Sequence, residues 1–155
     1  MGIQLPVISL HQPWASWIAW GYKNVETRGH TRFGKLVGQR VGIHAARKWD
    51  RDAWFARRFL PRGAQARLLQ KRYPRGAIVA TARIWDYGPM VPGDELGALL
   101  ACHDGVVAYR LTDVVRVMPE YPAKGRQGIW YVEVEEWQFD RFMFTDGEMT
   151  PSARA

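Results

Sequence analysis

Apolar runs separated by turn residues constrain the fold of this chain more than any other feature. Residues 77–86 give the clearest strand signal, since this run is long and rich in β-branched side chains. Other runs predict strands at residues 5–10, 24–28, 40–45, 106–117 and 129–134. A helical pattern follows the first of them. We therefore expect an α+β fold, in which a small, curled, mostly antiparallel sheet closes as a β-barrel with flanking helices.

The helix after the first strand is expected to pack in the core. Pro13 suits its first turn, and Trp14, Trp17 and Ile18 recur at the i, i+3 and i+4 spacing of one apolar stripe. Such a stripe is more typical of core packing than of a ligand site. Residues 30–39, by contrast, are polar and contain glycine, so we expect a turn or an exposed loop there.

Basic residues are segregated along the chain. Residues 28–75 contain 14 of the 22 Lys and Arg residues but only two acids, which gives this segment a net charge of +12 in a chain of net charge +7. Such segregation predicts a positive face, and the usual partner of a positive face is a polyanion such as nucleic acid. A solvated basic surface without a partner is the alternative.

Within this segment, residues 49–72 indicate a basic helical insertion. Asp50 is expected to cap a first helix that runs to Phe59, and a second helix is expected at residues 64–72, with Leu68 and Leu69 facing inward. The cations expected to contact phosphates are Arg47, Lys48, Arg57, Arg58, Arg62, Arg67, Lys71 and Arg72.

Length and composition predict one domain. We expect it to occupy residues 1–145 and to be followed by a flexible tail at residues 146–155. Cys102 is the only cysteine of the 155 residues, so no internal disulfide can form, which suits a reducing cytoplasm. No apolar run approaches the roughly 18 residues of a membrane span, and no secretory signal is visible. A cytoplasmic protein without membrane contact is therefore expected.

The best candidate site is a cluster of polar residues around the predicted helix. Gln12, Pro13 and Trp14 lie at its start, where free backbone N–H groups favour an anion. Lys23 and Arg28 follow the helix and could bind the same anion, Arg28 through two parallel hydrogen bonds.

Two further residues suggest proton transfer. Glu26 shares a strand face with Arg28 and could accept hydrogen bonds from a base edge or act as a general base. His44, at the end of the next strand, could shuttle protons near neutral pH. A structural ion pair between Glu26 and Arg28, and a hydrogen-bonded histidine at a strand end, are the alternatives. Metal-binding spacing, phosphate-loop glycine motifs and a Ser-His-Asp arrangement are not recognisable, so no metal site is predicted.

Five segments in order, spanning about residues 5–134, resemble the ASCH domain of the PUA-like superfamily, closest to the activating-signal-cointegrator type and to small bacterial or phage members. These segments are Ser9-Leu-His-Gln-Pro-Trp-Ala15, Gly21-x-Lys23-x-x-Glu26-x-Arg28, Ile43-His-Ala-Ala46, Pro74-Arg-Gly-Ala-Ile-Val79 and Pro122-Ala-Lys-Gly-Arg-Gln-Gly-Ile-Trp130. The resemblance implies a PUA-like β-barrel with helices beside it, and binding of RNA or DNA.

The resemblance also implies two enzymatic possibilities. Some bacterial ASCH proteins are metal-dependent ribonucleases, and another branch hydrolyses the acetyl amide of N4-acetylcytidine with a Lys and a Thr in a K-x-x-T-x-R motif. Lys23 and Arg28 match this motif, but Glu26 stands where that branch has its nucleophilic Thr. Thr27 is one residue out of register and would face the other side of a strand. Amide hydrolysis by that route is therefore the less expected activity.

Three functions remain open at this point. The one we expect is binding of RNA, or of DNA, with contacts from Gln12, Pro13, Trp14, Arg28, Arg47, Lys48, Arg75, Lys124 and Arg126. The second is an enzyme acting on RNA or a modified nucleoside through Lys23, Glu26 and His44, with Mg²⁺ or Mn²⁺ only in the ribonuclease case. The third is a protein-interaction module anchored by exposed tryptophans.

Overall fold

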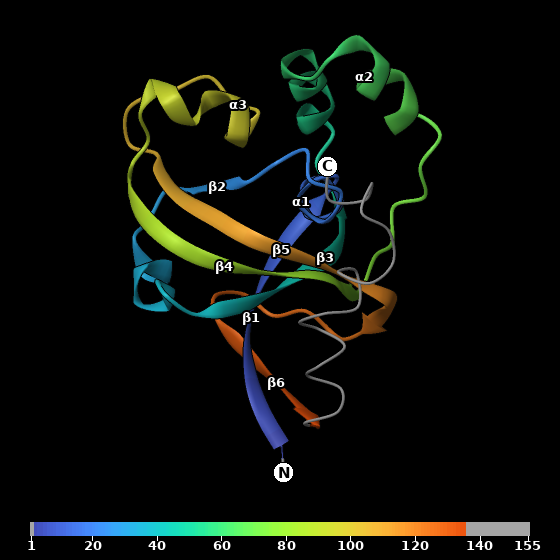
Figure 1. Cartoon of the computed structure of the whole chain (residues 1–155), viewed down its shortest axis with the longest axis vertical. Coiled ribbons are helices and arrows are strands. Elements are labelled where there is room, and N and C mark those ends of the chain that lie inside the picture. The colour runs from blue at the N-terminus through green and yellow to red at the C-terminus, as the bar shows by residue number, and fades with distance from the viewer. Residues whose placement is uncertain (1, 136–155) are drawn as a thin grey trace.

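The computed structural model describes residues 2–135, which form one mixed six-stranded sheet with short helices around it (Figure 1). The strands are β1 (Gly2–Gln12), β2 (Val25–Arg28), β3 (Arg40–Trp49), β4 (Ala77–Pro89), β5 (Val107–Pro122) and β6 (Trp130–Glu135). Their order in the sheet is β2-β5-β4-β3-β1-β6, and only β1 and β3 pair in parallel. The sheet curls into a half-barrel, which confirms the expected α+β, mostly antiparallel fold. The tail predicted at residues 146–155 lies outside the described residues.

The parallel pair follows from the long connection between β1 and β3. This connection contains α1 (Trp14–Ala19), β2 and the 3-10 helix η1 (Arg32–Leu36), long enough to return the chain in the same direction. Helix α1 contacts β1, β3, β4 and β5, and its Trp17 and Ile18 are fully buried. Trp17 and Ile18 of the predicted apolar stripe are therefore core, whereas Trp14 is only partly buried.

The segment predicted as a turn or exposed loop, residues 30–39, is mostly exposed but contains the 3-10 helix η1 with two buried side chains. Its helix η1 places Phe33 at 1 % exposure against Tyr109, whose hydroxyl donates to the carbonyl oxygen of His30 and accepts from the Phe33 N–H. Two apolar side chains, Phe33 and Leu36, anchor this otherwise polar segment on the sheet.

The basic insertion consists of the 3-10 helix η2 (Asp52–Phe59) and α2 (Arg62–Leu68). Asp50 accepts the N–H groups of the first turn of η2, as expected of a cap. The insertion packs on α1 through an aromatic cluster formed by Trp14, Trp17, Trp20, Trp49, Trp54 and Tyr73. Leu68 is buried, but Leu69 is 63 % exposed, because α2 ends at Leu68 and the chain turns away. The inward orientation predicted for Leu69 was therefore wrong.

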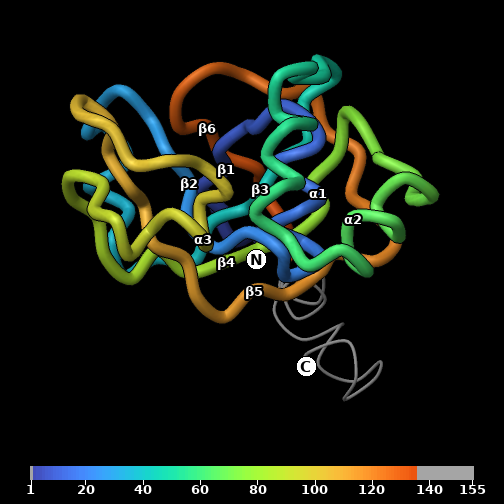
Figure 2. Tube along the Cα trace, turned by 90° about the horizontal axis from the view of Figure 1, so that it is seen from above, coloured from blue at the N-terminus to red at the C-terminus, as the bar shows by residue number. Residues whose placement is uncertain are grey.

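Two more short helices, η3 (Pro92–Asp94) and α3 (Glu95–Ala98), connect β4 to β5. The carboxylate of Asp94 accepts two hydrogen bonds from the Arg110 guanidinium, which ties this connection to β5. Figure 1 shows that α3 and the insertion lie at the same end of the half-barrel, with α3 on the left and α2 on the right, and Figure 2 shows both helices from above. Within residues 2–135, no helix combines the length and apolarity that crossing a bilayer requires.

Candidate functional site

Two adjoining cavities open beside the half-barrel. The larger has a volume of about 1150 Å³ and lies between the ends of β1 and β3, the segment before and within η1, and the loop after β5. The smaller, of about 310 Å³, lies between β1, the start of α1, β2 and the end of α3. Ser9, His11 and Arg28 line both cavities, so the two spaces share a wall.

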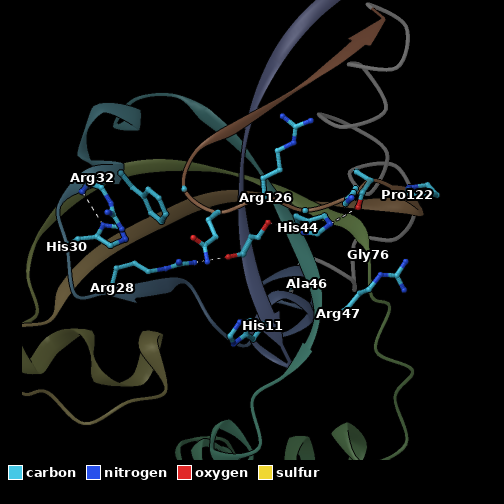
Figure 3. Close-up of a pocket in the computed structure, with 17 residues that line it drawn as sticks. His11, Arg28, His30, Arg32, His44, Ala46, Arg47, Gly76, Pro122 and Arg126 are labelled. Atoms are coloured by element: carbon cyan, nitrogen blue, oxygen red, sulfur yellow. Dashed lines mark hydrogen bonds between the residues drawn. The ribbon is translucent and has the colours of Figure 1, made fainter.

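The lining of the larger cavity is cationic. Its Lys and Arg residues are Arg28, Arg32, Arg47, Lys124 and Arg126, and its histidines are His11, His30 and His44. Among the described residues that line it, none is Asp or Glu. Figure 3 shows Arg28, His30 and Arg32 on one side and His44 and Arg47 on the other. A cleft with cations on opposite walls favours an anionic ligand.

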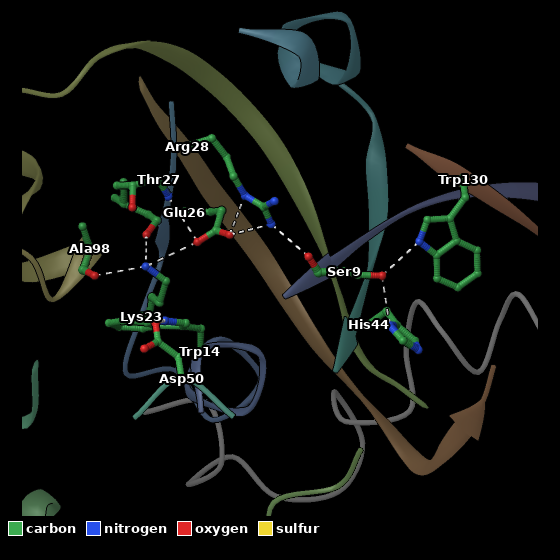
Figure 4. A network of polar contacts seen from close by, with 11 residues as sticks. Ser9, Trp14, Lys23, Glu26, Thr27, Arg28, His44, Asp50, Ala98 and Trp130 are labelled. Atoms are coloured by element: carbon green, nitrogen blue, oxygen red, sulfur yellow. Dashed lines mark hydrogen bonds and ion pairs between the residues drawn. The ribbon is translucent and has the colours of Figure 1, made fainter. Parts of the chain in front are cut away.

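Arg28 belongs to the shared wall and links the edge strand β2 to β1. From β2, its Nη2 donates to the carbonyl oxygen of Ser9 in β1 at 2.9 Å, while Nε and Nη2 both contact Oε2 of Glu26 at 3.0 and 2.9 Å (Figure 4). Its guanidinium also lies over the ring of Phe33. The structural ion pair considered for Glu26 and Arg28 is thus present, and both residues line the smaller cavity.

Lys23 is buried in the smaller cavity at 2 % exposure. Its Nζ donates to the carbonyl oxygens of Val25 and Ala98 at 2.6 and 3.0 Å, and lies 3.6 Å from Oε1 of Glu26 (Figure 4). Burial lowers the pKa of Lys23 below its ordinary value, an effect that the negative charge of Glu26 opposes. Lys23 and Glu26 therefore lie as a buried pair of opposite charges at the wall of the smaller cavity.

A second hydrogen-bonded group connects Ser9, His44 and Trp130. A carbonyl oxygen can only accept, so Nε2 of His44 carries the proton that it donates to the Ala123 carbonyl at 2.8 Å. Nδ1 then accepts from the Ser9 hydroxyl at 3.0 Å, and the Ser9 oxygen accepts from Nε1 of Trp130 at 3.1 Å. Burial lowers the pKa of His44, which keeps the ring neutral at neutral pH. His44 is thus a hydrogen-bonded histidine, which is the alternative that the sequence analysis set beside a proton shuttle.

The remaining residues predicted near the helix start have different positions. Gln12 is buried; its side-chain oxygen accepts from the Ser16 N–H and its amide donates to the Ser16 hydroxyl and to the Pro74 carbonyl. Gln12 and Pro13 line neither cavity. Trp14 does line the smaller one, where its indole N–H donates to Asp50 and its ring lies 4.8 Å from the Lys23 ammonium.

Most cations of the predicted phosphate-binding set lie outside both cavities. Arg47 lines the larger one, whereas Lys48 and Arg75 are exposed residues that line neither, although Arg75 donates to the Arg47 carbonyl. Several cations of the insertion instead lie on aromatic rings or form an ion pair, as in the pairs Arg57–Trp54, Arg58–Phe59, Lys71–Trp20 and Arg72–Glu120. The structure thus brings Lys124 and Arg126, and not the insertion, to the candidate site.

Sequence reasoning missed several residues of the larger cavity: Ser9, His11, His30, Arg32 and Phe33. The available signal was weak, because Ser9 and His44 are adjacent only through the parallel register of β1 and β3. Among residues 2–135, no three His, Cys, Asp or Glu side chains converge as a metal site requires.

Comparison with solved structures identifies the fold. Two structures of mutants of the ASCH protein from Zymomonas mobilis each match at 16 % identity and a TM-score of 0.53, covering 86 % of this chain and 92 % or 94 % of theirs. A further structure of that ASCH protein matches at 14 % identity and a TM-score of 0.51, covering 88 % of this chain and 91 % of its own. No family model and no curated protein matches the sequence. The chain therefore has an ASCH-type fold.

Proposed function

We propose that this chain binds single-stranded nucleic acid, RNA in preference to DNA, in the larger cavity. The observation that supports this most directly is the lining: five Lys or Arg residues and three histidines, without an acid among the described lining residues. Phosphate groups are the biological anions that match several cations spread over opposite walls.

The size of the cavity favours a nucleotide within a strand. Its volume of about 1150 Å³ slightly exceeds the roughly 300–1,000 Å³ of ordinary small-ligand sites, which leaves room for a base together with its neighbouring phosphates. A recess of this kind receives bases only when they are unstacked, as in single-stranded RNA. The rings of His11 and His30 would lie beside such a base, and the cations beside its phosphates.

Fluorescence anisotropy with short labelled single-stranded RNA, single-stranded DNA and duplex DNA tests the proposal. If all five cations contact phosphates, the log–log dependence of affinity on salt should have a slope on the order of −3.5. Arg47→Ala should reduce the magnitude of this slope by about 0.7. Lys35→Ala, which removes an exposed cation of η1 outside both cavities, is the matched control. A slope near zero for RNA, or equal losses in both variants, would reject the proposal.

The second candidate is an enzyme acting on RNA or a modified nucleoside, and the observation that favours it is the Lys23–Glu26 pair. A buried lysine with a lowered pKa beside a carboxylate, at the wall of a cavity joined to a cationic one, is an arrangement suited to proton transfer. Turnover should be measured on RNA with Mg²⁺ or Mn²⁺ and on N4-acylated cytidines. Lys23→Ala and Glu26→Gln should each remove activity while Lys35→Ala retains it; full activity in both site variants would eliminate this candidate.

A further inference from the structure

The loop Lys124–Gly128 forms one wall of the larger cavity, and its backbone N–H groups make no hydrogen bond with the other residues that the structure describes. All five residues are exposed. Lys124 and Arg126 add side-chain cations to the same wall. Consecutive free N–H groups beside cationic side chains can surround one anion from several directions.

His44 and Ser9 lie directly against the backbone of this loop and restrict its path. A Cβ atom added to Gly125 would lie 2.5 Å from Cε1 of His44 and 3.1 Å from the Ser9 hydroxyl oxygen. Because no side chain fits in that space, only glycine allows the loop to cross directly over the Ser9–His44 hydrogen bond.

Both ends of the loop are attached to the same group. At one end, the Ala123 carbonyl accepts from Nε2 of His44, and the Ala123 N–H donates to the Gly76 carbonyl at 3.1 Å. Just beyond the other end, Trp130 donates to the Ser9 hydroxyl and packs edge-on against the His44 ring. His44 therefore contacts the residue before the loop directly and is linked to Trp130, two residues beyond the loop, through Ser9.

We propose that Lys124–Gly128 is a phosphate-binding loop and that His44 is its positioning residue. The ligand is a phosphodiester of single-stranded nucleic acid, bound by the backbone N–H groups together with Lys124 and Arg126. This inference rests on the proposed nucleic-acid binding, and it assigns to His44 a role distinct from proton shuttling. Phosphate fits this loop better than a planar carboxylate does, because its tetrahedral oxygens can accept from backbone and side-chain donors at once.

The direct test observes the backbone. In ¹H–¹⁵N NMR spectra of the full chain, added single-stranded RNA should shift the amide resonances of Gly125 and Gly128, whereas Gly63 and Gly93, which lie outside the cavity, should not shift. If RNA binds while Gly125 and Gly128 stay unchanged, the loop assignment is wrong although nucleic-acid binding stands. Absence of any RNA binding would overturn both. Titration with inorganic phosphate is the third arm: shifts as large as those with RNA would identify a free-phosphate site and refute the phosphodiester assignment.

The positioning role is tested by variants that keep the volume of His44. His44→Phe removes both hydrogen bonds and should reduce the magnitude of the salt slope by about 1.4, the value for two lost phosphate contacts. His44→Gln retains a donor for Ala123 and should restore most of the slope. When His44→Phe is added to the Lys124→Ala/Arg126→Ala double variant, the magnitude of the salt slope should not fall further.

Gly125→Ala provides an independent route if His44→Phe fails to fold. Its methyl group cannot fit over His44, so the loop must lift and the slope should fall by the same amount, while His44 itself is retained. A wild-type slope in Gly125→Ala, or an additive loss when His44→Phe is combined with the double variant, would refute the positioning role.

Discussion

Replacement of Arg28 by alanine should lower the free energy of unfolding. The contacts of the Arg28 guanidinium allow the size of this loss to be worked out. The change leaves the buried Glu26 carboxylate without its nearest cation and removes the only hydrogen bond described here between β2 and β1. Removing one partner of a buried ion pair costs about 3–5 kcal/mol. Arg28 is 26 % exposed, and Glu26 keeps the Thr27 N–H and the Lys23 ammonium as partners. We therefore expect a loss of about 2–3 kcal/mol, a substantial part of the roughly 5–15 kcal/mol typical of a domain.

Urea unfolding followed by tryptophan fluorescence measures this loss. The decisive comparison is a double-mutant cycle, because Glu26→Gln removes the charge that Arg28→Ala leaves unpaired. The double variant should be more stable than the sum of the single losses predicts, by at least about 1 kcal/mol. Arg32→Ala is the control, since it removes an exposed guanidinium from the same cavity and should change stability by less than about 0.5 kcal/mol. Losses that add within about 0.5 kcal/mol would show that the ion pair does not carry the stabilisation.

Three further predictions concern the core and the titrating groups. Trp17→Ala should cost about 3–5 kcal/mol by opening a cavity between α1 and the insertion, whereas Trp85→Ala, at 55 % exposure, should change the urea midpoint little. Hydrogen bonds from Arg110 lower the pKa of Asp94, so their stabilisation is present above the unfolded carboxyl pKa and is lost as pH falls through the folded value; in urea midpoints measured down to acidic pH, Asp94→Asn should flatten this dependence, and an unchanged curve would contradict it. Because burial lowers the pKa of His44, its contribution to stability is complete above the unfolded histidine pKa and declines as pH falls below it. An NMR titration should find that His44 titrates below the unfolded histidine value of about 6.5, and titration above that value would contradict the hydrogen-bond assignment.

Much of the scaffold was predictable because its signals are local. The strands follow from apolar runs, and the burial of Trp17 and Ile18 follows from helical spacing. The grouping of Lys23, Glu26 and Arg28 was also accessible, since a short segment around β2 holds all three. Local patterns do not predict burial that depends on contacts with residues far away in the sequence. Phe33 is an example, because its ring packs against Tyr109.

The residues that line the larger cavity were harder to predict from the sequence, because they come from segments far apart in the chain. Ser9 becomes a neighbour of His44 only once β1 and β3 pair in parallel, and Gly125 reaches both only through the course of its loop. Charge density alone pointed to the insertion, but charge density does not reveal that Arg57 lies on Trp54 instead of facing a cavity.

The position of the insertion's cations outside the larger cavity has a consequence for binding kinetics. Cations that lie outside the bound-state contacts still contribute to the long-range field, and such a field accelerates the diffusional encounter with a polyanion. If nucleic acid enters the larger cavity as proposed, neutralising Arg58 or Arg62 should slow association at low salt and leave dissociation nearly unchanged. The few groups inside the larger cavity would then set the dissociation rate, and the many cations outside it would raise the association rate.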